Sequence, residues 1–164
     1  MIISEANIKD FDEIWEIFHH VIQSGTTYVY SPQTTREGAF DIWMQRPLKT
    51  FVVRLKETRQ MVGTYYIKEN RPDLGSHICR CGFMVSPNFR RNGIGELMCK
   101  HSFIQAKSMG FRGIQLGYVV STNTASVQLW LKMGFTQVGC VPKAFQHSNL
   151  GDVDVLIMYK PLSD

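Results

Sequence analysis

Near the middle of the chain, an apolar stretch ends at a proline and is followed by a basic, glycine-containing loop and a long amphipathic segment. The stretch from Val85 to Gly95 reads Val-Ser-Pro-Asn-Phe-Arg-Arg-Asn-Gly-Ile-Gly. This order predicts a strand, a turn and the start of a helix, because proline cannot continue the ladder of a central strand. The first N–H groups of a helix have no partner within it, and the helix dipole adds positive charge there. The glycines let phosphate oxygens approach the backbone, so the segment predicts an anion site.

The spacing of the glycines decides which phosphate ligand fits this loop. A P-loop needs Gly-x-x-x-x-Gly-Lys-Ser/Thr, and the chain contains no such string. The dinucleotide-binding pattern needs a third glycine after Gly93 and Gly95, and it is missing. The pattern that fits is Arg-x-x-Gly-x-Gly, with Arg90 as its first residue. It resembles the acetyl-CoA pyrophosphate loop of the GNAT N-acetyltransferase superfamily.

The segments around the loop strengthen this resemblance. Residues 78–85 and 113–120 have the composition of buried strands, and the apolar positions between Gly95 and Gly110 fit a helix with one buried face. The following segment, 123–135, runs from an asparagine to Gly-Phe and resembles the second signature of the family. Two signatures in the right order, separated by one strand, indicate the family far better than either alone.

The resemblance extends over nearly the whole chain. Residues 2–6 resemble the opening strand of the family, and residues 142–147 with 153–159 resemble the closing hairpin of a bacterial subgroup of small-molecule and amino-acid acetyltransferases. It implies an α/β fold: a mixed, mostly antiparallel central sheet whose parallel central strands splay apart, with helices on both faces. We therefore expect a single acetyltransferase domain over residues 1–164.

Local signals give an order of elements that agrees with this fold. Asn7 with Asp10, and Thr34 with Glu37, have the spacing of helix capping boxes. The first predicted helix presents one apolar face, made by Ile8, Phe11, Trp15, Phe18 and Ile22, and Pro47 is expected to stop the second. The predicted order is strand, two helices, three strands, helix, strand, helix and two strands, which is typical of a mixed sheet covered by helices.

Composition excludes several classes of protein. The net charge of +4 is modest and scattered, which argues against a nucleic-acid-binding protein and suits a polyanion such as CoA. No apolar run approaches the ~20 residues that cross a bilayer, and the first residues do not resemble a signal peptide, so we expect a cytoplasmic protein without membrane contact. The cysteines, Cys79, Cys81, Cys99 and Cys140, lack the spacing of a zinc or redox site and are expected to be buried thiols, so no metal is expected.

The resemblance implies a set of residues that bind acetyl-CoA. The main chain of Met84 and Val85 would bind the pantetheine arm, and Arg90 would add positive charge beside the pyrophosphate. The N–H groups expected to hold the pyrophosphate belong to Arg91, Asn92, Gly93, Ile94 and Gly95. Asn123 and Ser126 would contact the arm, although an asparagine there also suits a helix N-cap and a serine there also suits the surface.

The catalytic residues stay unassigned, because the usual pair is absent. Many family members place a Glu on the strand that ends at Val85 and a Tyr where this chain has Trp130, and residues 76–82 contain no carboxylate. Water-mediated deprotonation of the amine is one alternative. His77 has a suitable intrinsic pKa but also suits a solvated loop. Tyr28, Tyr30 and His147 lie in segments that border the acceptor pocket in this family, and we expect them to contact the acceptor.

The resemblance implies an acetyl-CoA-dependent N-acetyltransferase that acts on the primary amine of a small molecule or amino acid. A peptide or protein acceptor is the first alternative. A non-catalytic acyl-CoA-binding domain is the second, since a scaffold does not guarantee activity. Family members are often homodimers, and that state is implied only by analogy.

Overall fold

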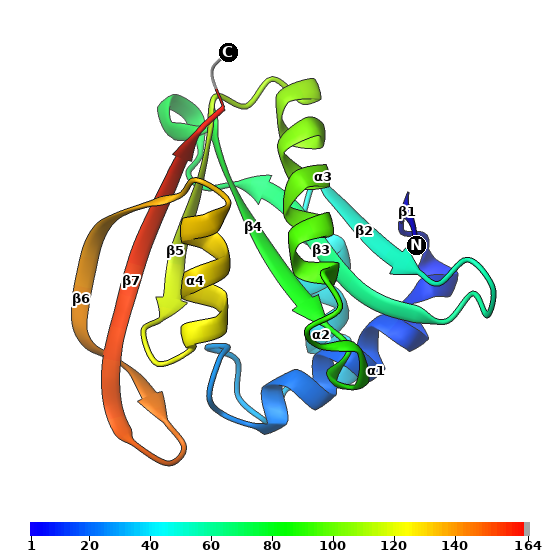
Figure 1. Ribbon diagram of the computed structural model, residues 1–164, viewed down its shortest axis with the longest axis horizontal. Helices are drawn as coiled ribbons and strands as arrows, with labels where there is room; N and C mark the ends of the chain where they lie inside the picture. The colour runs from blue at the N-terminus through cyan, green and yellow to red at the C-terminus, as the bar shows by residue number, and fades with distance from the viewer. Residues whose placement is uncertain (163–164) are drawn as a thin grey trace.

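The structure is a computed structural model that describes residues 1–162, and Figure 1 shows its arrangement. The strands are β1 (Ile2–Glu5), β2 (Lys49–Arg54), β3 (Met61–Glu69), β4 (Ile78–Val85), β5 (Gly113–Val120), β6 (Thr136–His147) and β7 (Gly151–Pro161). The α-helices are α1 (Phe11–Gln23), α2 (Arg36–Phe40), α3 (Ile94–Ser108) and α4 (Thr124–Lys132). Short 3-10 turns cover Ile8–Asp10, Asp73–Gly75 and Pro87–Phe89, and a π-helical turn over Asp41–Gln45 extends α2.

Within residues 1–162 the strands form one sheet in the order β1-β2-β3-β4-β5-β7-β6. Neighbouring strands are antiparallel except for β4 and β5, which are parallel. Helices α3 and α4 lie on one face of the sheet and α1 and α2 on the other (Figure 1). The predicted fold class and the predicted order of elements are confirmed.

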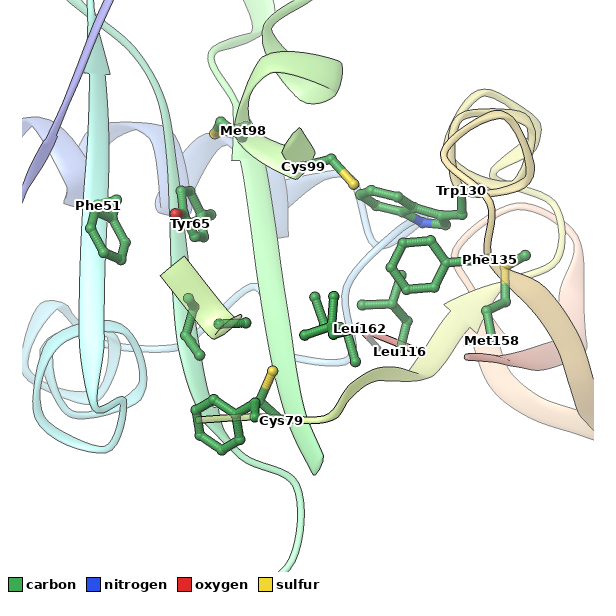
Figure 2. Close-up of a cluster of buried hydrophobic side chains, with 14 of the residues drawn as sticks. Phe51, Tyr65, Cys79, Met98, Cys99, Leu116, Trp130, Phe135, Met158 and Leu162 are labelled. Atoms are coloured by element: carbon green, nitrogen blue, oxygen red, sulfur yellow. The ribbon is translucent and has the colours of Figure 1, made fainter. Parts of the chain in front are cut away.

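The larger hydrophobic cluster lies between the sheet and helices α3 and α4 (Figure 2). Met98 and Cys99 of α3 are fully buried in it. Trp130 of α4 packs on Phe83 of β4 and on Phe135, with ring centroids 5.0 and 5.9 Å apart. Burial of such large side chains is the main stabilising term for a sheet covered by helices, and here it fixes both helices above β4 and β5.

The second cluster lies on the opposite face, under α1 and α2. Trp43 is fully buried and packs edge-on against Tyr66 at 4.8 Å. Its indole N–H donates to Thr64 Oγ1 at 3.0 Å, and that hydroxyl donates to the Phe51 carbonyl at 2.8 Å. The polar atoms of this cluster are therefore paired, which removes the cost of burying them.

Several local predictions are confirmed and others are wrong. Asn7 and Asp10 form the predicted capping box. The second helix is capped by Thr35, whose hydroxyl accepts from the Gly38 N–H, while Thr34 donates to the Ser31 carbonyl instead. The neighbouring threonines offer the same cap chemistry, so the sequence alone does not separate them.

Burial corrects three other expectations. Ile8 of the predicted apolar face is 74% exposed, because it lies in the 3-10 turn before α1 rather than in the helix. Cys140 is exposed on β6, whereas Cys79 and Cys99 are buried as expected and Cys81 is half-buried. Burial raises the pKa of the Cys99 thiol to about 12 and the pKa of Cys81 well above its ordinary value, so these two thiols are protonated at neutral pH.

Candidate active site

The central strands β4 and β5 pair over only a short stretch and then diverge. Each strand has eight residues, yet the parallel ladder joins only Ile78 to Gly113 and Cys79 to Ile114. The two strands move apart toward the end that leads into α3 (Figure 1). The predicted splay of the central strands is therefore present.

The alternation of the backbone shows which groups lose their partners. The His77 carbonyl accepts from Arg112 on the β5 side, and the Ser86 N–H donates to Val62 on the β3 side. Because successive residues of a strand direct their N–H and C=O groups to opposite sides, Phe83 and Val85 face the gap. By the same alternation the main chain of Met84 faces β3, where it pairs with Thr64. Of the two residues expected to bind the pantetheine arm, Val85 therefore has its main chain toward the gap, as does Phe83, and Met84 does not.

The loop between β4 and α3 has the open backbone that an anion site requires. Arg91 and Gly93 have positive φ values of 62° and 74°, and Gly93 is the N-cap of α3 without a side-chain cap bond. A Cβ added at Gly93 would have no atom within 4 Å. Arg90 and Arg91 are exposed beside it. The first N–H groups of α3 thus point to accessible space flanked by positive charge, as an anion site needs.

Three residues of the predicted loop also have roles within the fold. The side-chain amide of Asn92 donates to the carbonyls of Phe89 and Arg90, each at 3.1 Å, and holds the loop in shape. Ile94 is 2% exposed and packs in the larger cluster. A Cβ on Gly95 would lie 2.9 Å from Leu129 Cδ2, so this glycine lets α3 approach α4 closely.

A cavity of about 570 Å³ opens between the splayed strands and the loop that follows α1. Residues of β4, β5, α4 and the segment 27–30 form most of its walls. Further polar side chains in the lining are Arg46, Tyr66, Asn70 and Arg71, together with Arg80 of β4. Asn123, Ser126 and Trp130 line it from α4. Asn123 is the N-cap of α4 but makes no side-chain cap bond, which leaves its amide available to the cavity.

The hydroxyl of Tyr28 occupies the gap beside β4. It donates to the Phe83 carbonyl at 2.7 Å and accepts from the Phe83 N–H at 2.9 Å. It therefore satisfies both main-chain groups that Phe83 loses where β5 diverges, and a buried backbone group without a partner would be costly. Tyr28, which we expect to contact the acceptor, lines the cavity, and its hydroxyl is engaged with the sheet.

Tyr30 and Tyr66 form the polar part of the wall on the α1 side. The Tyr30 ring stacks on that of Tyr28 at 6.2 Å, and its hydroxyl interacts with that of Tyr66. Burial raises the pKa of all three tyrosines, and the neighbouring Arg80 offsets this rise only in part for Tyr30 and Tyr66. These hydroxyls stay protonated at neutral pH, so they can donate hydrogen bonds and cannot serve as general bases.

The two histidines considered from the sequence lie outside the cavity lining. The Nδ1 atom of His147 accepts from the N–H groups of Asn149 and Leu150, at 3.1 and 3.2 Å, and holds the turn between β6 and β7. His77 is exposed in the loop before β4. Among residues 1–162, the side chains that line the cavity include no histidine and no carboxylate. The structure therefore does not bring His147 to the acceptor cavity, because its ring is used in the turn.

Sequence reasoning missed the residues that reach the cavity from elsewhere in the chain. Arg80 lines the cavity from β4 and Tyr66 lines it from β3. Gly82 lets the Tyr66 ring lie over β4, because a Cβ on Gly82 would be 2.5 Å from that ring. The sequence signal for Arg80 was its spacing: side chains two residues apart on a strand share a face, so positions 80, 82 and 84 lie on one face of β4.

No helix in residues 1–162 is long and apolar enough to cross a membrane. No three His, Cys, Asp or Glu side chains in the same part of the chain are grouped to hold a metal ion.

Comparison with known proteins agrees with this geometry. Residues 12–135 match the model of the acetyltransferase (GNAT) family. The N-acetyltransferase aca1 of Schizosaccharomyces pombe is 30% identical over 157 residues, in a match that covers 85% of this chain and 75% of that protein.

A GCN5-related N-acetyltransferase from Kribbella flavida has a similar structure, with a TM-score of 0.92, 34% identity and coverage of 98% of this chain and 96% of that one. The structure of yncA from Salmonella typhimurium, solved with its cofactor acetyl-CoA, shares the fold at 20% identity, with a TM-score of 0.86 over 100% of this chain and 95% of that one. The chain therefore belongs to the acetyltransferase (GNAT) family.

Proposed function

We propose that this N-acetyltransferase moves an acetyl group from acetyl-CoA to the primary amine of a small molecule or amino acid. The observation that carries the proposal is the cavity of about 570 Å³ at the opening between β4 and β5. Its volume lies within the range of small-ligand sites, about 300–1,000 Å³. A peptide acceptor would favour an open trough, and the cavity is bounded on the α1 side by residues 27–30.

Acetyl-CoA would bind along the side of β4 that faces the gap and at the first turn of α3. Its pyrophosphate would accept from the N–H groups of residues 91–95, with Arg90 supplying charge. Its pantetheine amides would pair with the main chain of Val85 and Phe83, which face the gap. Asn123 and Ser126 would contact the arm from α4. These contacts remain part of the proposal.

The reaction needs a neutral amine beside the thioester. The amine nitrogen attacks the acetyl carbon, the carbon–sulfur bond then breaks, and the released thiolate takes a proton to give CoA. An N–H group of β4 that faces the gap would stabilise the oxyanion of the tetrahedral intermediate. Since the lining side chains among residues 1–162 include no carboxylate or histidine, we propose that water carries the proton away from the amine.

An acceptor screen tests the proposal. Purified protein is incubated with acetyl-CoA and a panel of amino acids, amines and short peptides, and free thiol and acetylated product are both measured. We expect acceptor-dependent thiol release with at least one amino acid or small amine. Transfer to peptides but to no amino acid or small amine would show that the acceptor is a peptide and would contradict the proposed acceptor class. Tight binding of acetyl-CoA without transfer to any acceptor would indicate a non-catalytic domain.

A further inference from the structure

Arginine side chains concentrate positive charge in the lining of the cavity, which we call its positive wall. Arg46, Arg71 and Arg80 line it, and the lining residues within 1–162 include no Asp or Glu. Arg80 is half-buried on β4, and its register partner on β3 is Lys68. Like charges directly opposite each other on neighbouring strands destabilise a sheet. A cross-strand pair of cations therefore has no stabilising role in the fold.

The nearby carboxylate does not balance these charges. Asp41 pairs with Arg46 at 2.6 Å, which leaves Lys68 and Arg80 in excess. Burial, Arg80 and Arg46 lower the pKa of Lys68, in that order, and Asp41 opposes them only weakly. The Lys68 ammonium lies over the Tyr66 ring, 5.9 Å from its centroid. The electrostatic field on this wall is positive and unneutralised.

Arg80 also has a buried hydrogen-bond donor without a partner. Its Nε atom is buried and makes no hydrogen bond in the part of the chain that the structure describes. Buried polar atoms are nearly always paired in folded proteins. The protonated hydroxyls of Tyr30 and Tyr66, which interact with each other, line the same cavity and add polar groups near Arg80.

The CoA phosphates do not account for this positive wall. Arg80 precedes Val85 by five residues, which is roughly 16 Å along a strand. By alternation, its side chain shares a face with Gly82 and Met84, and Met84 packs in the cluster under α1 and α2. The pyrophosphate loop instead leads into α3 on the opposite face.

From this arrangement we infer that the acceptor amine carries an anionic oxyacid group, a carboxylate or a phosphonate, which binds Arg80 together with the hydroxyls of Tyr30 and Tyr66. The inference rests on the proposed function and narrows its acceptor class. An arginine fork and hydroxyl donors suit the geometry of such oxyanions. The same field disfavours a positive charge on the acceptor nitrogen, and so favours the neutral amine in a site whose described lining offers no carboxylate or histidine.

Matched acceptors provide the first test. Amino acids are compared with their carboxamides, with the corresponding amines that lack the acid, and with aminoalkylphosphonates. We expect kcat/KM for the acid to exceed that for its carboxamide by at least about tenfold, the effect of one charge-assisted hydrogen bond. The phosphonate series shows which oxyacid the site prefers. Equal or better rates with the carboxamides would overturn the inference and leave the proposed function intact.

Substitution of Arg80 provides the second test. In Arg80→Gln the KM for the acidic acceptor should rise about 10- to 100-fold, while the KM for acetyl-CoA stays within twofold. Arg80→Glu should abolish the preference for acids. Arg112→Gln, at an exposed arginine just before β5 that does not line the cavity, is the matched control and should leave both constants unchanged. An unchanged KM for the acid in Arg80→Gln would refute the role of Arg80.

Two further measurements serve as controls, one for the folding of the Arg80 variants and one for the case in which no acceptor is acetylated. Removing Arg80 relieves its repulsion from Lys68, so thermal stability should be equal or higher. If no acceptor is acetylated, the proposed function fails, and calorimetry still decides the inference. Acidic amines should bind the wild-type protein loaded with CoA, bind Arg80→Gln at least tenfold more weakly, and be preferred over their carboxamides. Binding that does not distinguish acid from carboxamide would overturn the inference in that case too.

Discussion

The hydroxyl of Tyr28 pairs with main-chain groups of β4 that a neighbouring strand would otherwise pair with. Where β5 diverges, it bonds to both the N–H and the carbonyl of Phe83, at 2.9 and 2.7 Å. A single side chain thus lets β4 and β5 splay without leaving the Phe83 main chain unpaired. Because Phe83 faces the gap that would hold the thioester arm, Tyr28 and the arm compete for the same backbone groups.

Replacing Tyr28 with phenylalanine should destabilise the free protein. The Tyr28→Phe change leaves one donor and one acceptor of Phe83 without partners, and each such buried group costs about 1–3 kcal/mol. Urea unfolding measures the loss. Saturating CoA should reduce it, because the arm would supply the missing bonds. Tyr118→Phe is the control, since that hydroxyl bonds the Ala144 carbonyl from an exposed side chain. An equal loss in both variants would contradict the role assigned to Tyr28.

At Gly93, a single substitution should weaken the binding of CoA while leaving the protein folded. Gly93→Asp places a carboxylate where we propose that the pyrophosphate binds, so the Kd for CoA should rise at least about 100-fold, by repulsion and by loss of the open backbone. The same carboxylate is at the N-terminus of α3, where negative charge interacts favourably with the helix dipole. Aspartate also tolerates positive φ better than most residues. Folding should therefore be retained.

Gly110→Asp is the matched control for Gly93→Asp. Gly110 follows the other end of α3, with φ +86°, and a Cβ there would also have no atom within 4 Å. The backbone strain is therefore comparable, but no anion site is proposed there. Calorimetry should give wild-type CoA affinity for Gly110→Asp. Wild-type affinity in Gly93→Asp would remove the loop from the acetyl-CoA site.

The first turn of α3 is linked to the C-terminal part of α4. Glu96, in the first turn of α3, pairs with Lys100 of the same helix at 2.7 Å and with Lys132 of α4 at 2.6 Å. Leu129 of α4 packs against the bare backbone of Gly95. The ion pair with Lys132 and this close approach hold the start of α3, and with it the loop after β4, against α4.

The contribution of Glu96 should depend on pH. Hydrogen bonds and charge attraction from Lys100 and Lys132 lower the pKa of Glu96 from 4.5 to about 2. A depressed carboxyl pKa stabilises the folded state above the unfolded-state value, and this stabilisation is lost as the pH falls from about 4.5 to about 2. Thermal unfolding of wild type and Glu96→Gln should therefore differ at pH 7 and converge near pH 2.

A second glutamate and salt provide the controls for Glu96. Glu16→Gln, at an exposed position on α1, should show no comparable pH-dependent difference from wild type. Added salt should reduce the Glu96 effect at pH 7, because exposed ion pairs are screened. A Glu96→Gln difference that persists unchanged near pH 2 would indicate packing rather than charge.

At the scale of the whole molecule, the splay divides the sheet into two arms that meet only at the short β4–β5 ladder. One arm contains β1 to β4 and the other contains β5, β7 and β6. Helices α3 and α4 bridge the arms on one face through the larger hydrophobic cluster. A ligand that pairs with both strands would add contacts across the gap, so its binding should stabilise the molecule as a unit.

Acetyl-CoA or CoA should raise the unfolding temperature. At a free concentration about 100 times Kd, a ligand that binds only the folded state adds about 2.7 kcal/mol. For a domain of this size that corresponds to about 5–10 °C in Tm. Differential scanning fluorimetry measures the shift, with adenosine as a control that lacks the pyrophosphate and the arm. No shift at saturating CoA would contradict the proposed site.

The sequence by itself determined the order of the elements, the fold class and the position of the glycine-containing loop between β4 and α3. These follow from signals carried by contiguous residues: apolar periodicity, the proline at 87, the capping box at Asn7 and the glycines at 93 and 95. Such signals depend on backbone conformation and on one buried face, which neighbouring residues specify. The resemblance to the family followed from the same local strings.

The tertiary structure alone decided how the site is lined. Tyr28 reaches Phe83 across 55 residues of sequence, Lys68 faces Arg80 through the β3–β4 register, and Gly95 receives Leu129. His147, chosen from its segment, is used in a turn instead. These side chains meet because strands pair and helices pack at long range, and no local pattern encodes which distant side chain fills the space beside another. The positive charge of the cavity lining is therefore a property of the folded chain, although each arginine was visible in the sequence.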